Sequence, residues 1–205
     1  MSFSQILEIA GFLIGLLYLW WEYFANPRVW LASVIMPAIS MWVYFSKGLY
    51  ADFAINIYYL AIAAYGYWAW TRKSNGGTDE KADTGTGTDG KKAALPIRHT
   101  PAAVVGGAVA ATAVLWAAIW WVLVTFTNST VPVADAFTTA LSIVALWMMA
   151  RKFAEQWLAW LVVDIVSSGL YLYKGLVFYA VLYLAYTVIA VFGYRKWLRL
   201  MQARQ

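Results

Sequence analysis

Seven apolar runs, each long enough to cross a lipid bilayer, set the strongest limit on how this chain can fold. A spanning helix needs about 17–25 mostly apolar residues, because hydrocarbon offers no partner for backbone N–H and C=O groups. The runs cover residues 5–24, 29–46, 50–70, 102–126, 133–150, 156–173 and 176–194. Only 12% of the 205 residues are charged, whereas a soluble domain has about 25%. The sequence therefore predicts an all-α integral membrane protein with seven transmembrane helices.

One polar segment, residues 72–101, separates the third span from the fourth. It is rich in Gly, Thr, Asp and Lys and has little to bury, which is typical of a flexible linker. The expected organisation is a first three-helix repeat at 1–71, the cytoplasmic linker at 72–101, a connecting helix at 102–127, and a second three-helix repeat with a basic tail at 128–205.

Lys and Arg are distributed unequally between the two ends of the spans. With seven helices, thirteen of the fifteen basic residues fall on one side, and only Lys47 and Lys174 fall on the other. Because basic residues favour the cytoplasmic side, the N-terminus is expected outside and the C-terminus in the cytoplasm. The net charge of +5 then reflects membrane topology, and no nucleic-acid partner is expected.

An internal repeat relates the first three spans to the last three. At an offset of 127 residues the two halves align without a gap. The matched pairs include Trp30 with Trp157, Gly66 with Gly193, and Trp70 with Trp197. The fourth helix returns the chain to the outer face, so both repeats have the same orientation. The predicted architecture is therefore 3+1+3, with two parallel three-helix repeats.

Asp164 lies in the middle of the sixth apolar run, with about eight uncharged residues on each side. An ionised carboxylate at the centre of a bilayer costs at least ~2.5–3.5 kcal/mol, and no Lys or Arg is expected at its depth. The acid must stay protonated, hydrogen-bond in a wet cavity, or receive its counter-charge from a ligand; a hydrogen bond between helices is the structural alternative. Nearby Trp and Tyr rings would add cation–π attraction. The pattern favours a site for a flat organic cation.

Aromatic and polar side chains at helical spacing complete the candidate site. Under the offset of 127, Asp164 is paired with Pro37, so both repeats have an unusual residue at one depth. Substrate-binding residues are predicted on four of the spans. They are Asp164, Trp160, Trp157, Asn56, Tyr59, Ser142, Trp147, Ser168, Trp116 and Trp120.

An enzyme is not expected. The chain has no Cys, and its single His, His99, lies in the polar segment, so no nucleophile–base pair and no metal cluster is available. No catalytic residue, metal or cofactor is predicted. Glu22 and Glu155 are expected near the inner ends of their spans, where Arg28, Arg151 or Lys152 could form ion pairs with them.

Several stretches together resemble the Pnu family of bacterial vitamin transporters. They are GLYADFAINIYYLAIAAYGYWAW, LPIRHTP, DAFTTALSIVALWMMARKFAEQWLAWLVVDIVSSGLYLYKGL and YLAYTVIAVFGYRKW. The resemblance covers nearly the whole chain except the linker. It implies a 3+1+3 fold in the bacterial inner membrane, transport by facilitated diffusion, and a cytosolic kinase that traps the vitamin by phosphorylation. The lipid bilayer is then a partner, and a homo-oligomer is compatible with this resemblance.

Two short stretches indicate which vitamin is carried. The nicotinamide riboside branch is expected to show VAQ and ENW, whereas this chain has VALW, with Leu146, and EQW, with Gln156. The stretches MPAI and EQWLAWLVVDIVSSGLY are more similar to the thiamine-transporting PnuT branch. The resemblance thus predicts thiamine as the substrate, with nicotinamide riboside as the alternative. Proton-coupled symport and a non-transporting membrane receptor are further alternatives.

Overall fold

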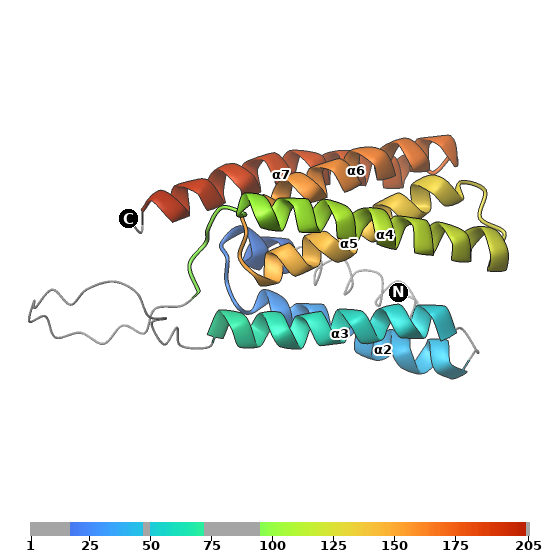
Figure 1. The fold of residues 1–205 in the computed structure, drawn as a ribbon, viewed down its shortest axis with the longest axis horizontal. Helices are drawn as coiled ribbons and strands as arrows, with labels where there is room; N and C mark the ends of the chain where they lie inside the picture. The colour runs from blue at the N-terminus through green and yellow to red at the C-terminus, as the bar shows by residue number, and fades with distance from the viewer. Residues whose placement is uncertain (1–16, 47–49, 72–94, 204–205) are drawn as a thin grey trace, which may run out of the picture. The chain divides into compact units, whose positions relative to one another are not determined.

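The computed structural model describes residues 17–46, 50–71 and 95–203, which are almost entirely helical (Figure 1). Residues 17–23 are helical. The helices that follow are α2 (Val29–Ser46), α3 (Tyr50–Thr71), α4 (Ala102–Phe126), α5 (Pro132–Ala150), α6 (Gln156–Tyr173) and α7 (Val177–Gln202). Most of the first predicted span, Lys47 and most of the predicted linker lie outside the described residues.

Helix ends follow the apolar runs closely, with one exception. Helices α2 to α6 begin and end within one residue of the predicted spans. Helix α7, predicted to end at residue 194, continues to Gln202. Arg and Lys are good helix formers, and basic side chains such as Arg199 suit the negative C-terminal end of a helix. The loss of hydrophobicity therefore marks the end of the apolar span, while the helix itself continues.

Two of the described helices are long and apolar enough to cross a membrane by composition alone. They are α4, with a mean hydropathy of 2.1, and α5, with 1.6. No residue of α4 is buried, which suits a helix in contact with lipid. The other described helices contain more Tyr, Trp and polar residues; Trp and Tyr are nevertheless common where spans meet the membrane interface.

The chain divides into two compact units. The first contains residues 1–21 and 26–96, and in it α2 packs along α3. The second contains residues 22–25 and 97–205. In the second unit α4 packs against α5, α5 against α6 and α6 against α7, so helices that are sequential in the chain are neighbours (Figure 1).

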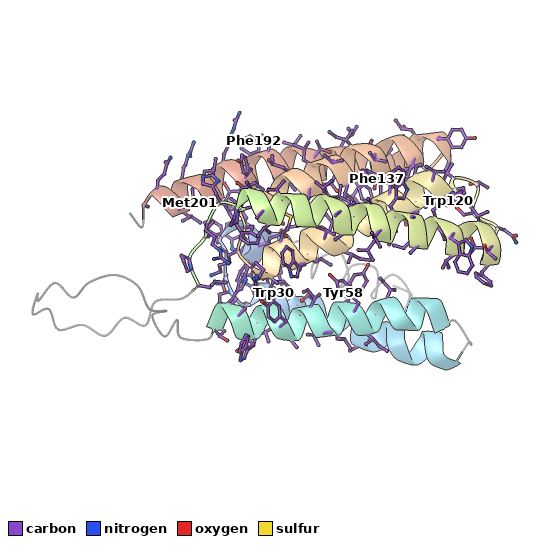
Figure 2. The ribbon with its side chains drawn as sticks, in the orientation of Figure 1. Trp30, Tyr58, Trp120, Phe137, Phe192 and Met201 are labelled. Carbon is purple, nitrogen blue, oxygen red and sulfur yellow. The ribbon has the colours of Figure 1, made fainter. Side chains whose placement is uncertain are left out.

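In the first unit, a large aromatic contact holds α2 and α3 together. The buried ring of Trp30 on α2 meets Trp70 on α3 edge to face, with ring centroids 5.5 Å apart (Figure 2). The same ring lies directly against the backbone of α3 at Gly66. A side chain at Gly66 would occupy the position of the Trp30 ring, so the close approach requires glycine there.

The second unit contains the same arrangement between α6 and α7. Trp157 on α6 meets Trp197 on α7 edge to face, with centroids 6.0 Å apart. A Cβ atom at Gly193 would lie 2.7 Å from the Trp157 ring. These three residues are the ones that the 127-residue offset pairs with the contact in the first unit.

Residues 97–101, at the end of the predicted linker, are attached to the turn between α5 and α6. Arg98 N donates to the carbonyl oxygen of Lys152 at 3.1 Å, and Ala154 N donates to the carbonyl oxygen of Arg98 at 3.0 Å. The guanidinium of Arg98 also lies 4.9 Å from the centre of the Phe153 ring. This part of the segment therefore has defined contacts, although its local composition favours a flexible linker.

Glu155 is bound by two residues of that segment. Nδ1 of His99 donates to Oε1 of Glu155 at 2.6 Å, and the backbone N and Oγ1 of Thr100 donate to Oε2 at 2.7 Å each. Partial burial acts to raise the pKa of Glu155, but the hydrogen bonds from His99 and Thr100 outweigh it and lower the pKa below its usual value. Glu155 is thus paired with His99 and Thr100 instead of the expected Lys or Arg. We call His99, Thr100 and Glu155 the Glu155 clamp.

Candidate functional site

Asp164 is buried on α6. Its residue is 6% exposed, and the buried face of α6 also contains Ser167 and Ser168. Across the described ranges of the chain, no Lys or Arg forms an ion pair with Asp164. An ionised group in such a place is costly unless a partner arrives. The charge of Asp164 is therefore left for something other than these residues to balance.

Tyrosines of α7 complete the surroundings of this acid. Tyr183 and Tyr186 lie within electrostatic reach of Asp164, and their rings meet edge to face at 5.7 Å. Tyr183 also stacks on Tyr171 of α6 at 5.1 Å, and Tyr171 stacks on Tyr179 at 5.4 Å. A tyrosine array thus begins beside Asp164 and continues toward the turn between α6 and α7. We call these four residues the tyrosine array.

A carboxylate beside electron-rich ring faces is an arrangement that binds organic cations. The carboxylate supplies the opposite charge, and the ring faces attract positive charge through their quadrupoles. Phenol groups add hydrogen-bond donors and acceptors. Among the residues for which the structure gives positions, no group of three or more His, Cys, Asp or Glu side chains could hold a metal ion. The carboxylate and the rings together suit the binding of an organic cation.

Trp160 and Ser168 lie about one turn of α6 on either side of Asp164. The Nε1 donor of Trp160 is buried and has no hydrogen-bond partner among the described residues. An orphaned donor costs about 1–3 kcal/mol, so an acceptor on a ligand would stabilise it. The hydroxyl of Ser168 donates to the carbonyl oxygen of Ala180 at 3.0 Å. Ser168 thus connects α6 to α7 next to the acid.

Three other predicted site residues are engaged in packing within the second unit. Trp157 forms the contact with α7 described above. The hydroxyl of Ser142 donates to the carbonyl oxygen of Thr138 in its own helix at 2.7 Å. Trp147 packs on Phe153, with ring centroids 6.0 Å apart.

Asn56 and Tyr59 belong to α3 in the first unit. Asn56 is buried, and Tyr59 lies 5.9 Å from the ring of Tyr58 (Figure 2). Under the 127-residue offset, Asn56 corresponds to Tyr183 and Tyr59 corresponds to Tyr186. The sequence analysis missed these two tyrosines as site residues. The repeat contained the signal, because it pairs them with two residues that were selected.

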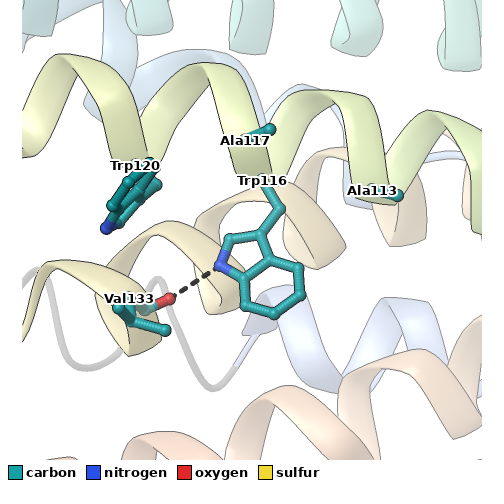
Figure 3. Close-up of a pocket in the computed structure, with 5 residues that line it drawn as sticks. All are labelled: Ala113, Trp116, Ala117, Trp120 and Val133. Carbon is teal, nitrogen blue, oxygen red and sulfur yellow. Dashed lines mark hydrogen bonds between the residues drawn. The ribbon is translucent and has the colours of Figure 1, made fainter.

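Trp116 and Trp120 of α4 line an apolar pocket beside α5. Nε1 of Trp116 donates to the carbonyl oxygen of Val133 at 2.9 Å, and Trp120 lines the same pocket of about 210 Å³ (Figure 3). A larger cavity of about 520 Å³ extends from Trp116 along α4 and α5. Asp164 and Trp160 line neither of these cavities. The structure therefore does not bring Trp116 and Trp120 to the acid.

Comparison with known proteins decides the family. The sequence profile of the nicotinamide mononucleotide transporter family matches residues 5–199. The chain belongs to this family. The match includes every described helix almost completely, and it confirms the resemblance to Pnu-family transporters noted from the sequence. Membership also agrees with a membrane-spanning protein.

Individual members of the nicotinamide mononucleotide transporter family are similar over much of the chain. The riboflavin/roseoflavin transporter RibM of Streptomyces davaonensis is 33% identical over 139 residues, 67% of this chain and 59% of RibM. This chain thus aligns with less than two thirds of RibM. The nicotinamide riboside transporter PnuC of Escherichia coli is 26% identical over 229 residues, 96% of this chain and 84% of that protein.

A solved structure shares the fold. A crystal structure of the vitamin B3 transporter PnuC aligns with a TM-score of 0.63, covering 94% of this chain and 80% of its own, at 21% identity. Thiamine, the substrate that the sequence predicts, is named for none of these three relatives.

Proposed function

We propose that this family member transports a small aromatic vitamin across the bacterial inner membrane, and that nicotinamide riboside is the substrate. Support comes from the family match and from PnuC relatives that align over most of the chain. The observation that carries the proposal is Asp164, a buried acid within electrostatic reach of Tyr183 and Tyr186 that forms no ion pair with a Lys or Arg of the described residues. The pyridinium ring of nicotinamide riboside supplies both a positive charge and a flat face.

Riboflavin and thiamine are the competing substrates. Riboflavin is favoured by the 33% identity with RibM, but its ring system is neutral and would leave Asp164 without a counter-charge. Thiamine carries a cation, and the sequence favours it partly through Gln156. In the structure Gln156 is fully buried and bonded to Glu22, so its side chain is not available to select for or against a ribose. The relatives support nicotinamide riboside better than thiamine.

The proposed mechanism is alternating access in a 3+1+3 arrangement of parallel repeats. One three-helix repeat moves against the other, while the Trp–Gly–Trp contacts keep each helix pair together. The N-terminus is outside and the C-terminus cytoplasmic, because thirteen of the fifteen basic residues then face the cytoplasm. Transport is facilitated diffusion without a cofactor, and a cytosolic kinase traps the vitamin. An assembly of identical chains is compatible with this mechanism.

Calorimetric titration of the purified full-length protein distinguishes the three vitamins. Nicotinamide riboside should bind, and Asp164→Asn should weaken its binding by roughly 30-fold or more, since truncating one partner of a buried charge pair costs about 2–5 kcal/mol. The matched control is Asp135→Asn, which removes an acid that is already paired with Lys174 at 3.3 Å and should keep the affinity. Tight binding of riboflavin or thiamine alone would replace the proposed substrate. Unchanged affinity in Asp164→Asn would exclude the carboxylate as the cation's partner.

Counterflow in proteoliposomes then separates a transporter from a receptor. Vesicles loaded with unlabelled nicotinamide riboside should take up labelled vitamin faster than empty vesicles. Binding without any counterflow would show a membrane receptor.

A further inference from the structure

Glu22 and Gln156 form a polar pair that is buried in the protein. Glu22 is 3% exposed and Gln156 is 0% exposed. Nε2 of Gln156 donates to Oε1 of Glu22 at 3.3 Å. On the other side, Nε1 of Trp197 donates to the backbone carbonyl oxygen of Glu22 at 3.0 Å. The expected Lys or Arg partner of Glu22 is thus replaced by an amide.

One acceptor atom in this pair has no hydrogen-bond donor among the described residues. Oε1 of Gln156 is buried and accepts no hydrogen bond from the described residues, which costs about 1–3 kcal/mol. Exchanging the oxygen and nitrogen of the amide does not help. In the flipped orientation, the oxygen of Gln156 lies next to Oε1 of Glu22. Two oxygen atoms can form a hydrogen bond only if one of them carries a proton. A proton on Glu22 would supply that donor from within the pair itself.

Charge leads to the same conclusion. Among the described residues, no Lys or Arg forms an ion pair with Glu22. Asp164, which lies about two turns after Gln156 on α6, acts on Glu22 electrostatically. Two ionised acids that repel each other inside a membrane would both be unfavourable.

The neighbouring elements also contain basic groups. They are Lys196 on α7, whose ammonium lies 5.3 Å from the centre of the Phe24 ring, and Arg151 and Lys152 after α5. The ion pairs within the described part of the chain do not include Glu22. A proton on Glu22 would neutralise it.

We propose that Glu22 is buried in its protonated form with Gln156 as its hydrogen-bond partner, so that of these two buried acids only Asp164 carries charge. The proton on Oε2 of Glu22 is donated to Oε1 of Gln156, while Nε2 of Gln156 donates to Oε1 of Glu22. This reciprocal pair satisfies the orphaned acceptor and removes the second negative charge. The inference deepens the proposed function, because a single negative charge on Asp164 matches a substrate with a single positive charge.

Infrared spectroscopy of the full-length protein without any vitamin tests this assignment. A protonated carboxyl group has a C=O stretching band that an ionised carboxylate lacks. The wild type at neutral pH should show this band, Glu22→Gln should lose it, and the matched control Asp164→Asn should keep it. A wild type without the band, or loss of the band only in Asp164→Asn, would overturn the proposal.

A second variant tests the partner rather than the proton. Gln156→Leu removes the amide, so the band of Glu22 should remain but shift in frequency. A band that does not move would mean that Gln156 is not its partner. Glu22→Gln keeps an amide donor for Oε1 of Gln156, so it should fold with an unchanged Tm. Because these readouts need no vitamin, they stand even if nicotinamide riboside fails to bind.

Discussion

Tyr183 is the residue through which the aromatic and charged parts of the candidate site meet. It lies within electrostatic reach of Asp164, and its ring stacks on Tyr171 of the neighbouring helix. A cation that approaches Asp164 would therefore have a fixed ring beside it. The stacked contact holds the ring in one orientation, which lowers the entropy lost when a ligand binds.

Replacing Tyr183 separates the contribution of its ring from that of its hydroxyl. Tyr183→Leu should weaken binding of nicotinamide riboside about 2- to 30-fold, because a cation–π contact is worth about 0.5–2 kcal/mol. Tyr183→Phe keeps the ring and should bind within a factor of about two of the wild type. Calorimetric titration of both variants provides the comparison. Equal losses in the two variants would identify the hydroxyl, rather than the ring face, as the contact.

Single residues differ in how far the sequence predicted them. Asp164 could be selected because a charge within an apolar run is a local signal. The Gln156 partner of Glu22 could not, because the two residues are 134 positions apart and their contact depends on how the helices pack. Tyr183 and Tyr186 were missed although the repeat pairs them with Asn56 and Tyr59, because a tyrosine-rich apolar helix gives no local sign of which face meets Asp164.

At the scale of helices, the pair α6–α7 depends on the absence of a side chain at Gly193. Gly193→Ala places a methyl group 2.7 Å from the Trp157 ring, and overpacking of this kind costs about 1–3 kcal/mol. The matched control is Gly169→Ala on α6, where an added Cβ meets nothing within 4 Å. Thermal unfolding in detergent should show a lower Tm for Gly193→Ala and an equal or higher Tm for Gly169→Ala. An unaffected Gly193→Ala would mean that the Trp157 ring can move away at little cost.

The hydrogen bonds of the Glu155 clamp should make the stability of the folded protein depend on pH. Because the pKa of Glu155 is lowered in the folded protein, its contribution to stability is complete above the usual glutamate pKa of about 4.3 and is lost as pH falls through the folded value. Glu155→Gln should therefore lower Tm at pH 7, and the difference from the wild type should shrink on acidification. Thr100→Val, which removes one donor but leaves His99, should have a smaller effect. A difference that stays constant with pH would contradict the assignment.

Helix positions were predictable where the relevant signal is local. The run of apolar residues from 102 to 126 defines α4 at both ends, since a polar, Pro-containing stretch precedes it and Thr, Asn and Ser follow it. The attachment of residues 97–101 was not predictable, because His99 and Glu155 are 56 positions apart. Their composition favours a linker, whereas contacts formed after folding hold them in place.

Across the whole molecule, the residues that the two repeats share have a different role from the residues in which the repeats differ. Trp30, Gly66 and Trp70 recur as Trp157, Gly193 and Trp197, and in both units they pack one helix on the next. Some residues near the acid differ between the repeats: Asp164 corresponds to Pro37 within α2, and Tyr183 to Asn56, whereas Tyr186 recurs as Tyr59. A substrate without two-fold symmetry is best bound by such differences, while the fold itself depends on the identities.

For the complete transporter, the membrane potential should set the direction and extent of uptake. Nicotinamide riboside carries one positive charge, and an interior-negative potential of 100 mV is worth about 2.3 kcal/mol per charge, or roughly 50-fold accumulation at equilibrium. Proteoliposomes with a potassium gradient and valinomycin should reach this ratio with labelled vitamin, and should only equilibrate without a gradient. A pH step at zero potential should have no effect, since Glu22 is proposed to keep its proton. Accumulation driven by the pH step would instead establish proton symport, and uptake that ignores the potential would show that no net charge moves with the substrate.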